Sequence, residues 1–412
     1  MSRFRAVSVV GLTVAIAATV SACGTATPMP TPTPSPTYAV TGDGVLRIGT
    51  LVDTSGSYAE GQVAGVETAV REINEAGGVN GAPVEVLHRN SGTTSEAVVA
   101  AYEGLVARGV DVVIGPQSSV LVDSLAEAVV TAGVPLISPS ASLADLGDSG
   151  LVFRTIGSYR SQGRVLAQLL AEEKVSSVAY LSVADDNGEA LLETLTAAAE
   201  DAGITLDYSG TYTASTASFT KIVTAVKKAK PAAIVIASGP DASTATTALI
   251  TALGDANLGG SKLWLTSQNL ADYSQTVAAG LLENASGLLE GSQPDEAFAA
   301  RLRQSDPSAP SLRYGQESYD ATILAALAAI QAADDGGPAI ARLLPVVSAN
   351  GIPCTSFGAC IDVLRTEPDI DYTGISGPVD VAASGDVGVA SWGVYRYGAT
   401  NTPSLLRTVL AG

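Results

Sequence analysis

The chain has 412 residues, and 46% of them are hydrophobic, so one large or two medium folded domains are expected. Asp and Glu outnumber Lys and Arg by 41 to 22, giving a formal net charge of −19 that argues against nucleic-acid binding. The single His and the three Cys, without a Cys-x-x-Cys pair, argue against a His-rich metal site, zinc binding and dithiol redox chemistry. We therefore expect no metal and no cofactor.

Residues 1–22 are predicted to be a lipoprotein signal peptide. Two Arg precede an apolar run of 15 residues, 6–20, which is short for a membrane span and typical of a signal-peptide core. The run ends in Val20-Ser21-Ala22-Cys23, which resembles the bacterial lipobox. This resemblance implies that the Cys23 thiol receives a diacylglycerol and that Cys23 becomes the new N-terminus. The alternative is a chance Cys after small residues.

Residues 23–41 are predicted to be a Thr/Pro-rich tether. Proline alternates with other residues over 27–36, and this spacing favours a semi-rigid, polyproline-II-like spacer of ~3 Å per residue. No later stretch reaches ~18 unbroken apolar residues. The lipid on Cys23 is therefore the expected attachment to the extracytoplasmic face of the cell membrane.

From residue 45 onward, apolar strands alternate with amphipathic helices. The run 45–52 predicts a buried strand, and apolar residues from Val63 to Ile73 then recur at helical spacing until Gly77-Gly78. The pattern continues with strands predicted at 84–87, 110–114 and 134–137 and helices at 97–106 and 120–132. This alternation predicts a parallel sheet covered by helices on both faces, with ligands at the carboxyl ends of the strands.

A second α/β unit is predicted to begin near Val175. Strands are expected at 177–181, 232–236 and 262–265, with helical stretches after the first two. The tail at 374–386 is rich in Gly, Ser and Asp and predicts turns and antiparallel strands. The fold class is therefore α/β, with two doubly wound parallel-sheet lobes.

Short motifs between Val45 and Tyr397 have the order and spacing of one known family. They are Ile48-Gly49, Ser55-Gly56, Gly61, Gly65, the run Ile73 to Gly81, Val113 to Pro116, Pro139 to Ser142, Phe153 to Thr155, Tyr314 to Ala321 and the tail 374–386. Each motif is weak alone. Together they resemble the type I periplasmic binding proteins, specifically the leucine/isoleucine/valine-binding branch.

The resemblance implies two lobes joined by three crossovers, with a cleft that closes on a ligand. It places lobe one at 42–157 and 292–372, and lobe two at 158–291 and 373–412. It further implies a monomer that hands a small-molecule solute to the permease of an ABC uptake transporter. A ligand-sensing receptor with the same fold is the alternative, and an extracytoplasmic hydrolase is a remote one.

The resemblance places ligand-binding residues of lobe one in two loops. They are Gln117, Ser118 and Ser119 after one strand, and Ser140 and Ser142 after the next. Independently of the family, small hydroxyls beside free backbone N–H groups at strand ends suit a carboxylate. The alternative is that Ser119 and Ser142 only cap the helices that follow them.

Lobe two departs from the family pattern. The aromatic wall of the family falls near Asn187, Gly239 lies in a loop that faces the cleft, and the family's carboxylate falls near Ser267 or Gln268. Neither of the last two is acidic, so an ammonium group would lack a partner unless Asp186 or Asp241 substitutes, and an unpaired buried charge is costly.

We therefore favour a small carboxylate or amide-bearing solute slightly over a leucine-like amino acid. Arg160, just after the first crossover, is a candidate for a second positive contact. Tyr58 and Tyr319 are candidates for side walls of the ligand site, and half-buried core residues are the alternative for both.

Cys354 and Cys360 lie close together near the end of the predicted first lobe. In an exported protein, two nearby cysteines usually form a disulfide that pins a loop. A Cys354–Cys360 disulfide is therefore predicted, and two free buried thiols are the alternative.

The segment Gly147-Asp148-Ser149-Gly150 looks like the nucleophile motif of trypsin-like proteases, but that chemistry needs a His to accept the serine proton. The only His is His88, within a predicted strand, and a structural role is expected for it. No Gly-x-Ser-x-Gly elbow and no phosphate-binding Gly-x-x-x-x-Gly-Lys occurs. The chain is therefore not expected to be an enzyme.

Overall fold

The computed structural model describes residues 40–412 except Ser57 and Ala144. The predicted signal peptide, Cys23 and most of the predicted tether lie outside the described residues. Within the described part, no helix combines the length and the apolar character needed to cross a membrane.

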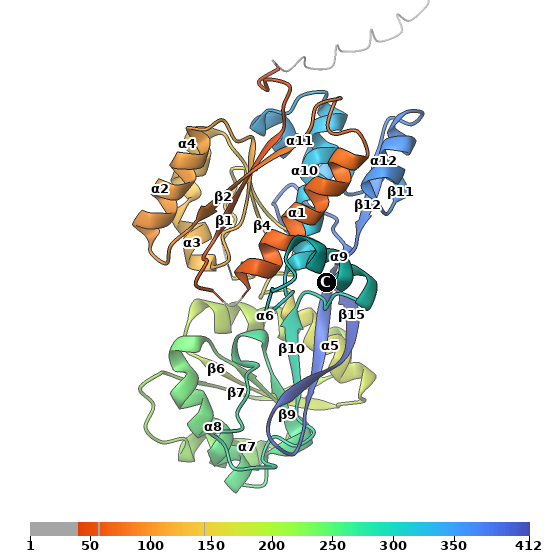
Figure 1. The fold of residues 1–412 in the computed structure, drawn as a ribbon. Coiled ribbons are helices and arrows are strands. Elements are labelled where there is room, and N and C mark those ends of the chain that lie inside the picture. The colour runs from red at the N-terminus through yellow and green to blue at the C-terminus, as the bar shows by residue number, and fades with distance from the viewer. Residues whose placement is uncertain (1–39, 57, 144) are drawn as a thin grey trace, which may run out of the picture. The chain divides into compact units, whose positions relative to one another are not determined.

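The first sheet has five parallel strands in the order β2-β1-β3-β4-β5 (Figure 1). Its central strands are short, apolar and buried, as expected of parallel strands that are covered on both faces. The strands are β1 (Arg47–Val52), β2 (Glu85–Asn90), β3 (Val112–Ile114), β4 (Leu136–Ser138) and β5 (Val152–Arg154).

Helices cover both faces of this sheet (Figure 1). One face carries α1 (Ala59–Glu75), α10 (Gly315–Ala332) and α11 (Gly337–Val347). The other carries α2 (Ser95–Val106), α3 (Ser119–Ser124) and α4 (Ala126–Ala132).

The helix predicted at 120–132 is in fact two helices, α3 and α4, which meet at Leu125. Near the junction, the Ser124 hydroxyl donates a hydrogen bond to the Val120 carbonyl, 2.7 Å away. A serine that bonds the carbonyl four residues back competes with the helical hydrogen bonds and bends helices, so the break has a local cause.

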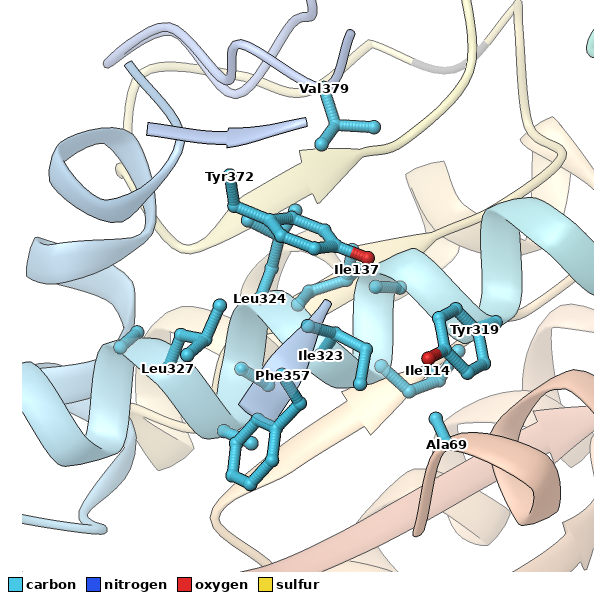
Figure 2. Packing of buried hydrophobic residues seen from close by; sticks show 14 of the residues in the cluster. Ala69, Ile114, Ile137, Tyr319, Ile323, Leu324, Leu327, Phe357, Tyr372 and Val379 are labelled. Atoms are coloured by element: carbon cyan, nitrogen blue, oxygen red, sulfur yellow. The ribbon is translucent and has the colours of Figure 1, made fainter. Parts of the chain in front are cut away.

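Helix α10 is the centre of the first core, because its residues from Gly315 to Ala329 are all buried. Figure 2 shows Ile323, Leu324 and Leu327 of this helix packed among residues of the sheet and of neighbouring segments. Helix α1 approaches it closely at Gly65, where a Cβ atom would lie 2.2 Å from the Gly315 carbonyl oxygen. The glycines seen in the sequence motif therefore allow this packing.

The second sheet has seven strands in the order β15-β14-β10-β9-β8-β6-β7. Strands β6 to β10 pair in parallel, and β14 and β15 continue the sheet in antiparallel fashion. The strands are β6 (Ser177–Val183), β7 (Thr205–Tyr212), β8 (Ala233–Ala237), β9 (Leu263–Leu265), β10 (Ser286–Glu290), β14 (Ala390–Tyr397) and β15 (Pro403–Ala411).

Two hydrophobic clusters flank this second sheet. Helices α5 (Gln162–Glu172) and α6 (Asp186–Asp201) contribute to one, and α7 (Thr220–Ala229) and α8 (Ser243–Asp255) to the other. Three short 3₁₀ helices follow strand ends or precede strands: η1 (Pro240–Ala242), η2 (Gly260–Lys262) and η3 (Ser267–Asn269). The predicted pair of doubly wound lobes is therefore confirmed.

The chain passes between the two sheets three times: after β5, after β10 and before β14. The segment before β14 contains α9 (Glu296–Ser305), α12 (Phe357–Leu364), β11 (Ile352–Cys354), β12 (Ile370–Gly374) and β13 (Gly377–Pro378). The predicted start of the last lobe-two segment at residue 373 is too early. Val379, Val381 and Val387 pack in the first core, so the change of lobe falls near β14.

A disulfide joins Cys354 at the end of β11 to Cys360 in α12, with the two Cα atoms 5.2 Å apart. Both cysteines are buried. The predicted pairing is therefore confirmed, and the disulfide holds α12 against the three-stranded sheet β11-β12-β13.

Candidate ligand-binding site

Three loops of the first lobe are joined by side-chain hydrogen bonds. The Ser140 hydroxyl donates to the Gln117 carbonyl at 3.2 Å and accepts from Gln62 Nε2 at 2.8 Å. Gln117 Oε1 accepts from the backbone N–H of Asp53 at 3.2 Å. Both predicted ligand contacts, Gln117 and Ser140, thus hold the loops after β1, β3 and β4 in place.

Ser118 and Ser119 lie at the start of α3. Ser118 is exposed, and its side chain does not cap the helix. The Ser119 hydroxyl accepts a hydrogen bond from the Leu143 N–H at 3.1 Å, which joins the loops after β3 and β4. A hydroxyl that accepts one hydrogen bond can still donate another, so the Ser119 hydroxyl is able to donate to a ligand.

Ser142 is buried in a loop whose backbone is held by hydrogen bonds from Arg154 and Tyr159. Its carbonyl accepts from Arg154 Nη1 at 2.7 Å and from the Tyr159 N–H at 2.9 Å. The Arg154 guanidinium also bonds the Ala141 carbonyl and forms a 2.8 Å ion pair with Asp386. Ser142 precedes no helix, and Ser119 is not the cap of α3, so helix capping explains neither residue.

Three residues of the second lobe follow strand ends. Asn187 lies in the first turn of α6, where the Asp185 carboxylate accepts from the Gly188 N–H at 2.7 Å. Gly239 follows β8, and Gln268 lies in η3 after β9. All three line one small cavity of about 30 Å³, together with Leu143 and Tyr159. We call it the cleft cavity, because residues of both lobes line it.

Two larger cavities adjoin the cleft cavity. One, of about 500 Å³, shares Leu143, Tyr159 and Asn187 with it and is also lined by Ser142 and Arg160. We call this the polar cavity. The other, of about 630 Å³, shares Ser238, Gly239 and Gln268 with the cleft cavity and lies beside α8. We call this the side chamber.

Asp186 lines the polar cavity, together with Arg160, whereas Asp241 lines none of the three cavities. The Arg160 guanidinium makes no hydrogen bond or ion pair with any residue that the structure describes. It is therefore available to a carboxylate in the polar cavity.

The two tyrosines predicted as side walls lie elsewhere. Tyr58 is partly exposed and makes an edge contact with Tyr314, with ring centroids 5.5 Å apart. Tyr319 is buried in the first core (Figure 2). Its hydroxyl donates to Glu72 at 2.7 Å. Neither residue lines the three cavities. The prediction for Tyr319 is wrong, because α10 is buried on all sides and its tyrosine faces α1 and not the cleft.

Sequence reasoning missed Glu290, a buried acid at the end of β10. Its carboxylate accepts from the Ser267 hydroxyl at 2.5 Å. Burial raises the pKa of Glu290, while hydrogen bonds from Ser267 and Ser142 and the charge of Arg313 lower it. The only signal of Glu290 in the sequence is that a charged residue ends an apolar strand. This signal does not reveal which residues bond the Glu290 carboxylate.

Arg313 was also missed. Its guanidinium lies 4.4 Å from the centroid of the Tyr314 ring and 5.0 Å from that of Tyr58. Cations are attracted to aromatic faces, so the two tyrosines hold this charge near the start of α10. In the sequence, Arg313 has no distinguishing neighbour other than Tyr314.

The protease-like motif lies apart from the only histidine of the chain. His88 Nδ1 is 2.8 Å from the Thr50 hydroxyl, and Nε2 is 3.3 Å from Glu67. Ser149 lies in a bend, and its hydroxyl accepts from the Leu151 N–H. Within residues 40–412, apart from 57 and 144, no group of three His, Cys, Asp or Glu side chains is placed to hold a metal ion.

Two wound α/β sheets, with strand-end loops that line adjoining cavities, define a two-lobed binding fold. The chain belongs to the family described as periplasmic binding protein, whose family model matches residues 45–384.

Curated relatives carry binding-protein names. A leucine-, isoleucine-, valine-, threonine- and alanine-binding protein of Pseudomonas aeruginosa is 32% identical over 175 residues, which cover 42% of this chain and 47% of the relative. The chain thus spans about half the length of that relative. The chemotactic signal transduction system substrate-binding protein BasB of Halobacterium salinarum is 27% identical over 360 residues, covering 82% and 83% of the two chains.

Solved structures share the fold. An ABC transporter substrate-binding protein from Desulfitobacterium hafniense in complex with Leu has a TM-score of 0.65 at 22% identity, covering 88% of this chain and 100% of that one. A solute-binding protein from R. palustris in complex with 4-hydroxybenzoate has a TM-score of 0.63 at 15% identity, covering 89% and 97%. At these identities the likeness establishes the fold and not the ligand.

Proposed function

We propose that the chain is an extracytoplasmic solute-binding protein that delivers a small polar solute to an ABC uptake transporter, and that it is not an enzyme. The observation that carries this proposal is the meeting of loops from both lobes at the cleft cavity. A site divided between two lobes suits capture and release by closure, in which hinge segments absorb the motion.

The solute is an amino acid, an amide or a small carboxylate, and we favour the last two. Gln268 offers an amide where an ammonium group would need an acid, and Arg160 offers a cation to a carboxylate. Asp186 also lines the polar cavity and offers a carboxylate to an ammonium group there, so amino acids remain among the tested solutes. Glu290 lines none of the three cavities and bonds Ser267. Of the two similar structures described above, one holds Leu and the other 4-hydroxybenzoate, so both ligand classes belong in the test.

A thermal-shift screen of the purified chain against amino acids, amides and small carboxylates tests the function. A solute that binds only the native state at a hundred times its Kd raises the free energy of unfolding by about 2.7 kcal/mol. We expect at least one carboxylate or amide to raise the melting temperature, and calorimetry to give a one-to-one complex. If no compound of the three classes binds, the proposal is wrong.

We expect the double variant Ser119→Ala with Ser142→Ala to weaken binding of the solute about 100-fold. Two hydrogen bonds to a charged or polar ligand contribute about 3 kcal/mol. Ser142 lines the polar cavity; Ser119 lines none of the three cavities, but its hydroxyl accepts from the N–H of Leu143, which lines two of them. Calorimetry on the purified variants measures the loss.

Ser149→Ala is the matched control, because Ser149 lies in an exposed bend, lines none of the three cavities and has a hydroxyl that accepts from the nearby Leu151 N–H. It should bind like the unaltered chain. Equal affinity in the double variant and the control would show that the two serines do not hold the ligand.

We propose that Cys23 carries the lipid anchor, as the lipobox-like sequence before it indicates. Cys23→Ala should release the chain from the membrane or leave it unprocessed, since the thiol is the acceptor of the lipid. Membrane fractionation and intact mass measure this. Thr25→Ala, two residues further on, should retain both the anchor and the lipid mass; retention of both in Cys23→Ala as well would rule the anchor out.

Ligand sensing is a second candidate function, favoured by the similarity to BasB over 82% of this chain. Deleting the gene distinguishes the two roles. Loss of uptake of the labelled solute supports transport, whereas normal uptake with a lost cellular response to the solute supports sensing.

A further inference from the structure

We propose that the solute carries an uncharged, hydrogen-bonding extension that passes Gly239 and occupies the side chamber beside α8. This inference rests on the proposed solute-binding function, and it adds a subsite and a chemical class to it. The head of the solute, a carboxylate or an amide, lies in the polar cavity beside Ser142 and Arg160, and the extension reaches the side chamber by way of the cleft cavity.

The first observation is the distribution of space. The cleft cavity measures about 30 Å³, little more than the room that one water molecule takes up. Pockets for small ligands usually measure about 300–1,000 Å³. The side chamber, at about 630 Å³, lies within that range and adjoins the cleft cavity. A solute bound at the cleft therefore has room for further atoms on the side of α8.

The second observation is the passage between the two cavities. Ser238, Gly239 and Gln268 line both of them. A Cβ atom on Gly239 would meet no heavy atom within 4 Å, and the backbone there does not have a positive φ. Neither backbone geometry nor close packing requires glycine at this position. Because Gly239 has no side chain, the passage between the two cavities stays open there.

The third observation is the chemistry of the chamber. Most of its exposed lining is apolar; its polar groups include the hydroxyls of Ser243, Thr244 and Thr276 and the amide of Gln268, and no Lys or Arg of the described chain lines it. Tyr273 and Asn269 already donate to backbone carbonyls. The one charged group is Asp272, which is exposed and accepts from the Ser274 N–H at 2.8 Å. A negative extension would find no cation there, and the exposed Asp272 attracts a positive extension only weakly. An uncharged extension with a short apolar stem and a hydroxyl or amide group therefore fits.

The test uses the purified full chain and two series of probe compounds. Within each series, the compounds share one head and differ only in the extension. The first contains succinamate, with its N-ethyl, N-(2-hydroxyethyl), N-(2-aminoethyl) and N-(2-carboxyethyl) amides. The second contains glutamine and the same N-substituted glutamines. Leucine and 4-hydroxybenzoate are added as compact reference ligands, and calorimetry measures affinities up to millimolar concentrations.

We expect the hydroxyethyl amide of at least one series to bind at least tenfold more tightly than its unsubstituted parent, and than the two charged amides. Gly239→Leu places a side chain at the passage and should remove that tenfold preference. Gly358→Leu in α12 is the matched control, because Gly358 also has open space around a Cβ atom and lines none of the three cavities. It should keep the preference, and circular dichroism confirms that both variants fold.

The other outcomes separate the two proposals. If compact ligands bind and no hydroxyethyl amide binds more tightly, or if the preference survives in Gly239→Leu, the side chamber is not a subsite and the solute-binding function stands. If the ethyl amide or a charged amide binds best, the proposed chemical class is wrong. If no probe and no compact ligand binds, the solute-binding function fails, and this inference fails with it.

Discussion

Asp320→Ala is expected to lower the free energy of unfolding by about 3–5 kcal/mol, because it leaves several buried donors without an acceptor. The Asp320 carboxylate is fully buried in α10. It accepts from the Tyr372 hydroxyl at 2.7 Å, from the Ile375 N–H at 3.0 Å and from the Ser376 N–H and hydroxyl at 2.8 and 2.5 Å. These bonds hold the turn between β12 and β13 against the first core. Urea denaturation of the purified variant measures the loss.

Two control variants make this prediction specific. Asp320→Asn keeps the shape and one acceptor oxygen, so it should lose less stability than Asp320→Ala. Asp362→Ala removes an exposed ion pair with Arg365 and should cost less than about 1 kcal/mol, as surface pairs do. If Asp320→Ala were no worse than Asp362→Ala, the four hydrogen bonds would not stabilise the fold.

We expect Glu317→Gln to remove a pH dependence of stability worth about 3 kcal/mol. The Glu317 side chain is buried in α10, and Oε1 accepts from the Ser292 N–H at 3.0 Å. Its pKa is raised from 4.5 to about 7, chiefly by burial and in part by nearby Asp320, while the Ser292 N–H and the charge of Arg313 oppose the rise. The side chain lies beside the crossover after β10, and the backbone carbonyl of Glu317 accepts from Thr155 in the crossover after β5.

The sign follows from the raised pKa. The folded chain holds this proton more tightly than the unfolded chain, so the contribution to stability is complete below pH 4.5. It is lost as the pH rises through about 7, because the folded chain must then bury a charge. The free energy of unfolding, measured from about pH 4.5 to 8, should therefore fall more steeply for the unaltered chain than for Glu317→Gln.

Half-buried Asp111 does not obscure this comparison. Burial also raises its pKa to about 7, but it is present in both chains, so its titration cancels in the difference between the two profiles, which reports Glu317 together with its interaction with Asp320. Asp111→Asn should give its own difference, additive with that of Glu317→Gln, if the two groups do not interact. Parallel profiles for the unaltered chain and Glu317→Gln would show that Glu317 does not titrate differently on folding.

Elements set by local pattern were predictable from the sequence. The strand that became β1 and the helix that became α1 follow from an apolar run and from apolar residues at helical spacing. Both signals lie within a few consecutive residues. The break between α3 and α4 was not predicted, because a serine hydroxyl that bonds its own helix leaves the apolar pattern unchanged.

Part of the candidate site was also predictable, because the carboxyl ends of parallel strands gather at one edge of a sheet. The structure places Ser142, Asn187, Gly239 and Gln268 in adjoining cavities, each after a strand that the sequence predicts. Tyr319 shows the limit of this reasoning. Its helix is buried all round, so the sequence does not tell which neighbour its side chain faces.

By itself, the sequence determined the alternation of strands and helices, the two wound sheets, the cysteine pair and the loops that supply the site, because each depends on residues close together in the chain. Only the tertiary structure decided that Glu290 meets Ser267, that residues 379–387 join the first core, and that a chamber opens beside Gly239. These features depend on contacts between distant segments. Packing of complete side chains sets such contacts, and no pattern within a single segment encodes it.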